Sequence, residues 1–275
     1  VYGYRSGYPN KLYLGEERSY SSLKEDINLT PAPTELSCQT IRVIGNSHSQ
    51  HILPMLRFIG DKFDMKVLAE KERNYTLIPN GDRKDLRLID DVLSSLDSGD
   101  MLVLSSRYRY LYQVPYLNAQ GDRWINHSDS KEKYGYGEKI WFEELDVVIR
   151  KAKEKQVNVV LFLPSVEFDV SVPVNSEICT ETRFRKPSEE CNPSVSKTFL
   201  NERFSKTWYE GVHQRSREES NFFVFDPLPI YCPGENCSRI VNGILAFRDT
   251  NHLTPEGALL MTEEFYAFLL KNHLL

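Results

Sequence analysis

Two short stretches, near opposite ends of the sequence, carry residue types that together can perform acyl chemistry. The first is Ile-Arg-Val-Ile-Gly-Asn-Ser-His-Ser at positions 41–49, which contains Ser47. The second spans positions 248–258 and contains Asp249 and His252. An aspartate can orient an imidazole, and the imidazole can take the proton of a serine hydroxyl, which makes that serine a nucleophile. The sequence therefore offers Ser47, Asp249 and His252 as a candidate catalytic triad.

The residues around Ser47 predict a strand, a tight turn and a helix. The apolar residues of 41–44 are typical of a short buried strand, and His48–Phe58 has apolar residues at helical spacing. Pro54 would kink a long straight helix here. A serine at such a turn lies at the carboxyl end of a strand, beside backbone N–H groups that can hold an oxyanion. Ordinary turns between a strand and a helix use the same small residues. The turn by itself therefore fits a catalytic serine and a plain connection equally well.

Taken together, the two stretches resemble the SGNH (GDSL-like) hydrolase and acyltransferase superfamily. In that superfamily an early Gly-Asp-Ser block carries the nucleophile, and a late Asp-x-x-His block carries the other two triad members. The form Asp-x-x-His-Leu-Thr-x-x-Gly-Ala at 249–258, preceded by a cysteine pair, is most similar to the SGNH domain fused to membrane acyltransferase-3 proteins. The resemblance covers roughly positions 38–275.

Those proteins O-acetylate cell-surface polysaccharides, so the resemblance implies a glycan O-acetyltransferase domain, with a substrate such as a lipopolysaccharide O-antigen. It also implies an N-terminal membrane acyltransferase-3 domain as a partner, absent from this chain, and a periplasmic or extracytoplasmic location in an inner-membrane protein. The ultimate acyl donor would be acetyl-CoA, used by the membrane domain. No cofactor is expected in this chain, because it has no Gly-rich phosphate loop and no basic cluster suited to acetyl-CoA.

Two features depart from the superfamily pattern. Asn46 occupies the position of the usual Asp, where an amide can still make the hydrogen bonds of the turn. The Gly-x-Asn-Asp block that supplies an oxyanion donor is absent, and Leu104–Tyr110 stands in its place. The candidate oxyanion donors are therefore the backbone N–H of Ser47, the side chain of Arg107, and Gly81, although the Asn-Gly pair there is more typical of a plain turn.

From position 38 onwards the sequence alternates candidate strands and helices. Strands are expected at Ile41–Gly45, Met65–Ala69, Met101–Ser105, Val157–Leu163 and Phe222–Phe225. Helices are expected at His48–Phe58, Leu86–Leu96, Glu138–Lys153, Pro193–Gln214 and Pro255–Lys271. This alternation predicts an α/β fold, with a three-layer α/β/α domain over 38–275 and a central, mainly parallel five-stranded sheet. Ser47 follows the first strand and the Asp249–His252 loop follows the last, so both belong at the carboxyl edge of the sheet.

Residues 1–37 show no regular period and are expected to form an irregular N-terminal extension. Five tyrosines are interleaved there with Gly, Ser, Pro and Glu, and Thr30–Thr34 is typical of a stiff connector. A solvated linker is one interpretation. So many aromatic side chains favour the other, an extension that packs on the catalytic domain.

Composition limits the possible functions. A chain of 275 residues can form one large domain, or a domain with an extension. Its net charge of −5 argues against a nucleic-acid partner, since a phosphate-binding surface needs basic residues. No apolar run approaches the roughly 20 residues that span a bilayer. No signal-peptide pattern is present and the chain begins with Val, so we expect any targeting or membrane segment to lie upstream.

The five cysteines favour disulfides in an oxidising compartment over free thiols. Cys232 and Cys237 bracket a short loop containing Pro and Gly, and Cys179 and Cys191 bracket a polar segment with no hydrophobic face. Cys38 is left over. A metal site is not expected, because the sequence has no Cys-x-x-Cys and no His pair at ligand spacing beside a cysteine.

The aromatic stretch 107–124 follows a predicted strand and is long for a connecting loop. Aromatic side chains in it can cover a sugar face while their polar ends bond hydroxyl groups, which suits a glycan acceptor. The candidates are Tyr108, Tyr110, Tyr112 and Trp124. Apolar cover for the edge of the sheet explains the same residues equally well.

Three classes of function stay open at this point. They are a glycan O-acetyltransferase domain, a free-standing carbohydrate or lipid esterase, and a catalytically inactive SGNH-like binding module. The triad does not separate the first two, which differ only in the second nucleophile. The resemblance favours O-acetyl transfer. His48, next to Ser47, is interpreted as a packing residue, and His51 has no partner that the sequence identifies.

Overall fold

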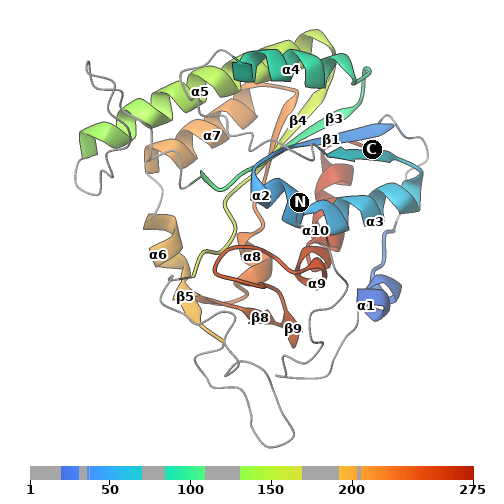
Figure 1. Cartoon of the computed structure of the whole chain (residues 1–275), viewed down its shortest axis with the longest axis vertical. Coiled ribbons are helices and arrows are strands. Elements are labelled where there is room, and N and C mark those ends of the chain that lie inside the picture. Colours follow the sequence, from blue (N-terminus) through green and yellow to red (C-terminus); the bar gives the residue numbers. More distant parts are fainter. Residues whose placement is uncertain are drawn as a thin grey trace, which may run out of the picture.

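A computed structural model describes residues 20–30, 36, 38–69, 84–108, 131–168, 192–202 and 206–275 of the chain (Figure 1). Its strands are β1 (Thr40–Gly45), β2 (Lys66–Ala69), β3 (Met101–Ser105), β4 (Asn158–Phe162), β5 (Ser194–Ser196), β6 (Phe222–Phe225), β7 (Asn236–Ser238), β8 (Ile240–Val241) and β9 (Ile244–Leu245). Its helices are α1 (Tyr20–Asp26), α2 (Ser47–His51), α3 (Leu53–Phe63), α4 (Lys84–Ser94), α5 (Lys131–Glu154), α6 (Lys197–Glu202), α7 (Lys206–Glu218), α8 (Leu228–Tyr231), α9 (Pro255–Leu259) and α10 (Thr262–Lys271).

Five strands form the central sheet, in the order β2-β1-β3-β4-β6, and every neighbouring pair is parallel. The middle strand β3 and its neighbour β4 are buried almost throughout. Near-continuous apolar strands are what a sheet covered on both faces requires. The predicted α/β fold with a parallel five-stranded sheet is confirmed.

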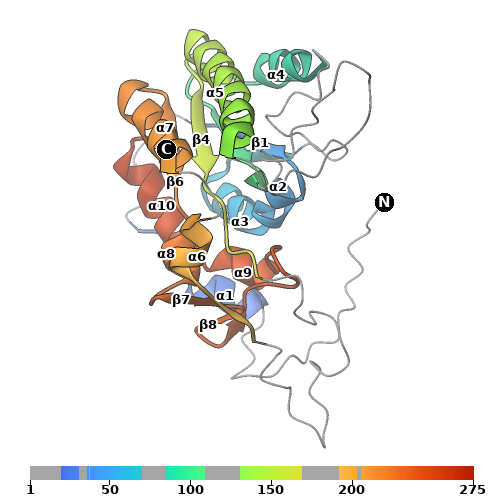
Figure 2. The same ribbon diagram turned by 90° about the vertical axis from the view of Figure 1, so that its left-hand side faces the viewer.

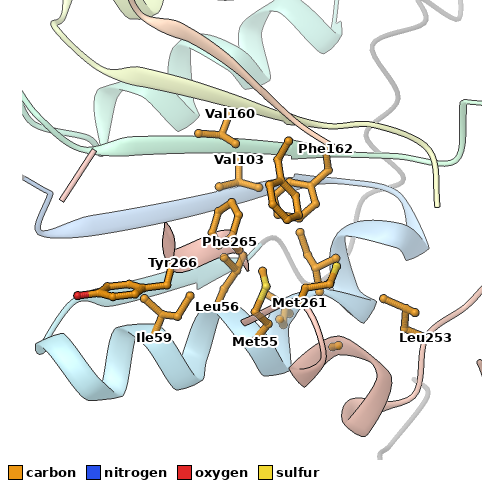
Figure 3. Close-up of a cluster of buried hydrophobic side chains, with 14 of the residues drawn as sticks. Met55, Leu56, Ile59, Val103, Val160, Phe162, Leu253, Met261, Phe265 and Tyr266 are labelled. Atoms are coloured by element: carbon orange, nitrogen blue, oxygen red, sulfur yellow. The ribbon is translucent and has the colours of Figure 1, made fainter. Parts of the chain in front are cut away.

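Helices cover both faces of this sheet (Figures 1 and 2). On one face, α4, α5 and α7 pack on the side chains of Leu102, Leu104, Val159 and Leu161. On the other, α3 and α10 pack on the alternate side chains, including Val103, Val160 and Phe162 (Figure 3). Successive residues of a strand point to opposite faces, so one apolar run supplies both cores.

Two of the expected helices are interrupted. The helix expected at His48–Phe58 is divided into α2 and α3 at Ile52, and Pro54 lies in the first turn of α3, where a missing N–H costs no helical hydrogen bond. The helix expected at Pro255–Lys271 is likewise divided into α9 and α10. In both places a short helix is followed by a longer one that packs on the core.

The single helix expected at Pro193–Gln214 is wrong. Residues 194–196 form β5, which pairs antiparallel with β7, so that Val195 lies opposite Cys237. Ser196 then accepts the N–H of Phe199 at 3.1 Å and caps the start of α6. Pairing with β7, which lies later in the chain, therefore makes the start of the predicted helix a strand, and α6 and α7 follow it.

Cys232 and Cys237 form a disulfide that closes the loop before β7, as their spacing indicates. Cys38 is a buried free thiol, and its pKa is raised to about 12 by burial. Cys179, Cys191 and most of the predicted extension 1–37 lie outside the described residues. No helix in the described part of the chain is long and apolar enough to cross a membrane.

We expect Gly45→Ala to destabilise the fold, because a Cβ at this position would overlap the carbonyl oxygen of Ser105 on β3 and because the backbone of Gly45 has φ +152°. The clash is with main chain, which has little room to move, so the loss in unfolding free energy should be about 3 kcal/mol. Urea denaturation followed by circular dichroism measures it. Gly234→Ala is the matched control, since no atom lies within 4 Å of its added Cβ. Equal stability of the two variants would contradict the prediction.

Candidate active site

Ser47 lies at the turn between β1 and α2, at the carboxyl edge of the sheet. Asn46 caps α2: its Oδ1 accepts the backbone N–H of His48 at 3.0 Å, and its carbonyl oxygen accepts the hydroxyl of Ser49 at 2.7 Å. Asn46 is buried, whereas Ser47 is exposed. The local sequence therefore fixes the turn from inside and presents the Ser47 hydroxyl to solvent.

The loop that carries Asp249 and His252 is closed by its own backbone. Phe247 and Leu253 form an antiparallel bridge, and the N–H of Arg248 donates to the carbonyl of His252 at 2.9 Å. Inside the loop, Oδ1 of Asp249 accepts two backbone N–H groups, at 3.0 and 2.8 Å. These bonds hold the carboxylate in one orientation relative to the imidazole.

This loop brings His252 to Ser47. Nδ1 of His252 donates to Asp249, at 2.8 Å from Oδ2 and 3.0 Å from Oδ1. With its hydrogen on Nδ1, the ring presents an unprotonated Nε2, which accepts the hydroxyl hydrogen of Ser47 at 2.7 Å. The His252 side chain is 20% exposed and the Asp249 side chain 32%. The three side chains form one hydrogen-bonded chain that is open to solvent at Ser47.

Asp249 is kept ionised by its neighbours. Burial acts to raise the pKa of Asp249, but the hydrogen bonds from His252 and from the loop backbone outweigh it and lower the pKa to about 2. At neutral pH the carboxylate holds the His252 hydrogen on Nδ1 and favours the imidazolium that forms when Nε2 takes a proton. The geometry can therefore activate a hydroxyl group as a nucleophile.

A family model described as "SGNH domain (fused to AT3 domains)" matches residues 21–267. The chain belongs to this SGNH family. Membership indicates acyl hydrolase or acyltransferase activity. Among curated proteins, no sequence matches the chain.

Two solved structures are similar to this SGNH domain at low sequence identity. One is a GDSL-like lipase from Bacteroides thetaiotaomicron, with 12% identity and a TM-score of 0.46, over 92% of this chain and 96% of that one. The other is a candidate acylhydrolase from Bacteroides fragilis, with 14% identity and a TM-score of 0.47, over 93% of this chain and 96% of that one.

Arg107 lies beside the Ser47 turn, but its side chain is engaged by a carboxylate. Its Nε and Nη2 donate to the two carboxylate oxygens of Glu167 at 2.8 and 3.2 Å, and its backbone N–H donates to Oδ1 of Asn46 at 3.0 Å. The pair joins the segments that follow β3 and β4 to the turn. A role for Arg107 in an oxyanion hole stays a prediction, and Gly81 lies outside the described residues.

Tyr108 lies in the core and not on the rim. It is 3% exposed, its hydroxyl donates to the carbonyl of Phe162 at 3.1 Å, and its ring packs against Trp141 and Trp208. Its position contradicts the prediction of substrate contact and agrees with the alternative, apolar cover for the sheet. The other predicted substrate contacts, Tyr110, Tyr112 and Trp124, lie outside the described residues.

Arg239 supports the Asp249 loop and was missed by the sequence analysis. It is 1% exposed, and its guanidinium donates to the carbonyl oxygens of Phe247 and Arg248 at 2.8 and 3.1 Å. Burial lowers the pKa of Arg239, and the nearby Asp249 carboxylate opposes that shift. A single arginine in a polar stretch carries no sequence signal for such a contact, because its partners are backbone carbonyls. In the described part of the chain, no three His, Cys, Asp or Glu side chains are grouped to hold a metal ion.

Two buried histidines make the fold sensitive to acid. Burial lowers the pKa of His48 from 6.5 to about 4, and burial also lowers the pKa of His51 well below its ordinary value. Between about pH 6.5 and 4 the unfolded chain therefore binds more protons than the folded one. Stability must fall as the pH drops through this window.

We expect the free energy of unfolding to fall by about 3 kcal/mol between pH 7 and pH 4 from His48 alone. Urea denaturation at a series of pH values measures this slope. His48→Gln removes the titrating group, so its stability should fall less over the same range. Asp249→Asn should change the slope only below about pH 5, where the carboxyl group of Asp249 begins to take up protons in the unfolded chain. A His48→Gln variant with the full wild-type slope would contradict the assignment.

Proposed function

We propose that this SGNH domain transfers an acetyl group to a hydroxyl of a cell-surface polysaccharide through an acyl-serine at Ser47. The observation that carries the proposal is the hydrogen-bonded chain from Ser47 through His252 to Asp249, in a domain whose family model is described as fused to AT3 domains. A free-standing esterase would use the same three side chains. The two activities differ in whether a sugar hydroxyl or water attacks the acyl-serine.

In the first step, Nε2 of His252 takes the Ser47 proton as Oγ forms a bond to the acyl carbonyl carbon. The negative charge that develops on the carbonyl oxygen needs N–H donors. The backbone N–H of Ser47 has no acceptor among the described residues and lies at the start of α2, so it is available as one donor. His252 then gives the proton to the leaving group, and the acetyl ester of Ser47 remains.

In the second step, a sugar hydroxyl gives its proton to Nε2 of His252, and its oxygen attacks the acetyl carbonyl. The ester bond to Ser47 breaks, and Oγ recovers a proton from His252, so that the acetyl group ends on the sugar. Asp249 stays ionised throughout and stabilises the imidazolium in both steps. The domain itself then needs no cofactor for this chemistry.

The acyl donor and the acceptor belong to the same proposal. An AT3 membrane domain would supply the acetyl group, with acetyl-CoA as the ultimate source, and the SGNH domain would act in the periplasm or another extracytoplasmic space. The description of the family model as a domain fused to AT3 domains supports this partner. Tyr110, Tyr112 and Trp124 remain the candidate contacts for the glycan.

We expect the chain to move an acetyl group from p-nitrophenyl acetate onto a de-O-acetylated oligosaccharide in a reaction that needs Ser47. Release of p-nitrophenol measures the first step, and mass spectrometry of the sugar measures the second. Ser47→Ala should abolish both, because the hydroxyl group that accepts the acetyl group from the donor is removed. Asp249→Asn should lower the rate by roughly 10³-fold or more, because the tautomer and the charge of His252 are no longer supported.

The same assay separates the alternatives. Release of p-nitrophenol that depends on Ser47 and ignores the sugar would identify an esterase and overturn the transfer proposal. Release that is unchanged in Ser47→Ala would overturn the triad as well. An acetyl group found on Ser47 after rapid acid quench would identify the covalent intermediate directly.

A further inference from the structure

We propose that His48 and His51 are positioning residues that hold His252 against Ser47. This inference rests on the proposed function, since it assigns a role toward the Ser47–His252 pair. Both histidines lie on α2, whose first residue is Ser47, and both contact the loop that carries His252. They are 2% and 6% exposed, so both rings are held mainly by contacts inside the domain.

Besides the Ser47–His252 bond, two hydrogen bonds among the described residues join α2 to this loop, one on each side of His252. Nε2 of His48 lies 3.1 Å from Oδ1 of Asn251, and the backbone N–H of Leu253 donates to Nδ1 of His51 at 3.3 Å. The residue after the nucleophile is thus bonded to the residue before the base. A displacement of the loop relative to α2 would have to break these bonds before it separated Ser47 from His252.

The partners determine where each ring carries its hydrogen. Asn251 donates its amide hydrogen to Oγ1 of Thr250, so its Oδ1 is the acceptor and Nε2 of His48 is the donor. Nδ1 of His51 accepts a backbone N–H, so it carries no hydrogen. Burial lowers the pKa of each ring, so both are neutral at neutral pH, with the hydrogen on Nε2. Protonation of His51 would turn its acceptor into a donor that faces the N–H of Leu253.

Neutral rings also suit the charge that His252 acquires. The centroids of the His48 and His51 rings lie 5.3 and 6.1 Å from that of His252. A positive charge on either ring would oppose the imidazolium that forms in catalysis. The other charged groups that act on these three rings are Asp249, Arg248, Arg107 and Glu167. Two neutral imidazoles therefore provide polar bonds beside His252 without adding a cation.

Paired variants test the proposal, because one member of each pair keeps the hydrogen bond. His48→Gln retains an N–H near the position of Nε2, and His51→Asn retains an acceptor near the position of Nδ1, whereas His48→Leu and His51→Leu retain neither. The measurement is the second-order rate constant for labelling of Ser47 by a fluorophosphonate between pH 5 and 9. This reaction needs an activated serine but no acceptor and no membrane partner.

We expect each Leu variant to label Ser47 about 10- to 100-fold more slowly than wild type at neutral pH, because a displacement of His252 by a fraction of an ångström to 1 Å costs that much. The Gln and Asn variants should recover to within about threefold, with the wild-type pH profile. His213→Leu, an exposed histidine on α7, is the control and should label at the wild-type rate. Thermal unfolding of every variant identifies those that fail to fold.

The outcomes distinguish this inference from the proposed function. If wild-type Ser47 is not labelled faster than other exposed serines, the proposed function fails first. If wild-type labelling is rapid and the folded Leu variants keep that rate, only the positioning role is overturned. If the Gln and Asn variants are as slow as the Leu variants, the role of the two hydrogen bonds is overturned, since the conservative side chains retain them.

Discussion

The 2.7 Å hydrogen bond between Ser47 and His252 joins residues that are 205 positions apart in the sequence. The elements that position each residue must therefore hold the two side chains at this distance. The sheet fixes the position of Ser47, because β1 lies inside it between β2 and β3 and ends at the turn that carries Ser47. The position of His252 is fixed less directly. After β6 the chain leaves the sheet for α8 and the short strands β7–β9, and it returns only at the Asp249 loop. Backbone contacts, not a sheet strand, therefore set the position of His252.

Those contacts come from three directions, and each uses the main chain of the loop. Arg239 donates to carbonyl groups at the start of the loop, the N–H of Phe168 donates to the carbonyl of Thr250 at 2.8 Å, and His51 accepts from Leu253 at its end. A loop whose backbone groups are bonded on several sides can hold a carboxylate and an imidazole in one geometry with little ordering left to occur during catalysis. Arg239 adds a buried positive charge behind Asp249, which favours the ionised carboxylate.

The parts of the structure that sequence could predict are those governed by local pattern. Apolar runs such as Met101–Ser105 and Phe222–Phe225 are strands with the expected bounds, since a run buried on both faces has few other places in a domain. The sequence pattern places Tyr108 on the rim because it belongs to a long aromatic stretch that follows a predicted strand. Its actual partners, Trp141 and Trp208, lie on α5 and α7, and no local pattern shows that two helices will enclose a ring there. The contact of Arg107 with Glu167 depends in the same way on β3 and β4 being neighbours.

Asn46 shows what the turn beside the nucleophile requires. Its Oδ1 accepts two backbone N–H groups, from His48 and from Arg107, so the position is used as an acceptor twice. A carboxylate can also accept both bonds, so an Asp at this position would be compatible with the same turn. An Asn here leaves its buried Nδ2 without a hydrogen-bond partner among the described residues, but it places no charge beside the ion pair of Arg107 and Glu167. A carboxylate here would add negative charge next to Ser47, which has to lose its proton to His252.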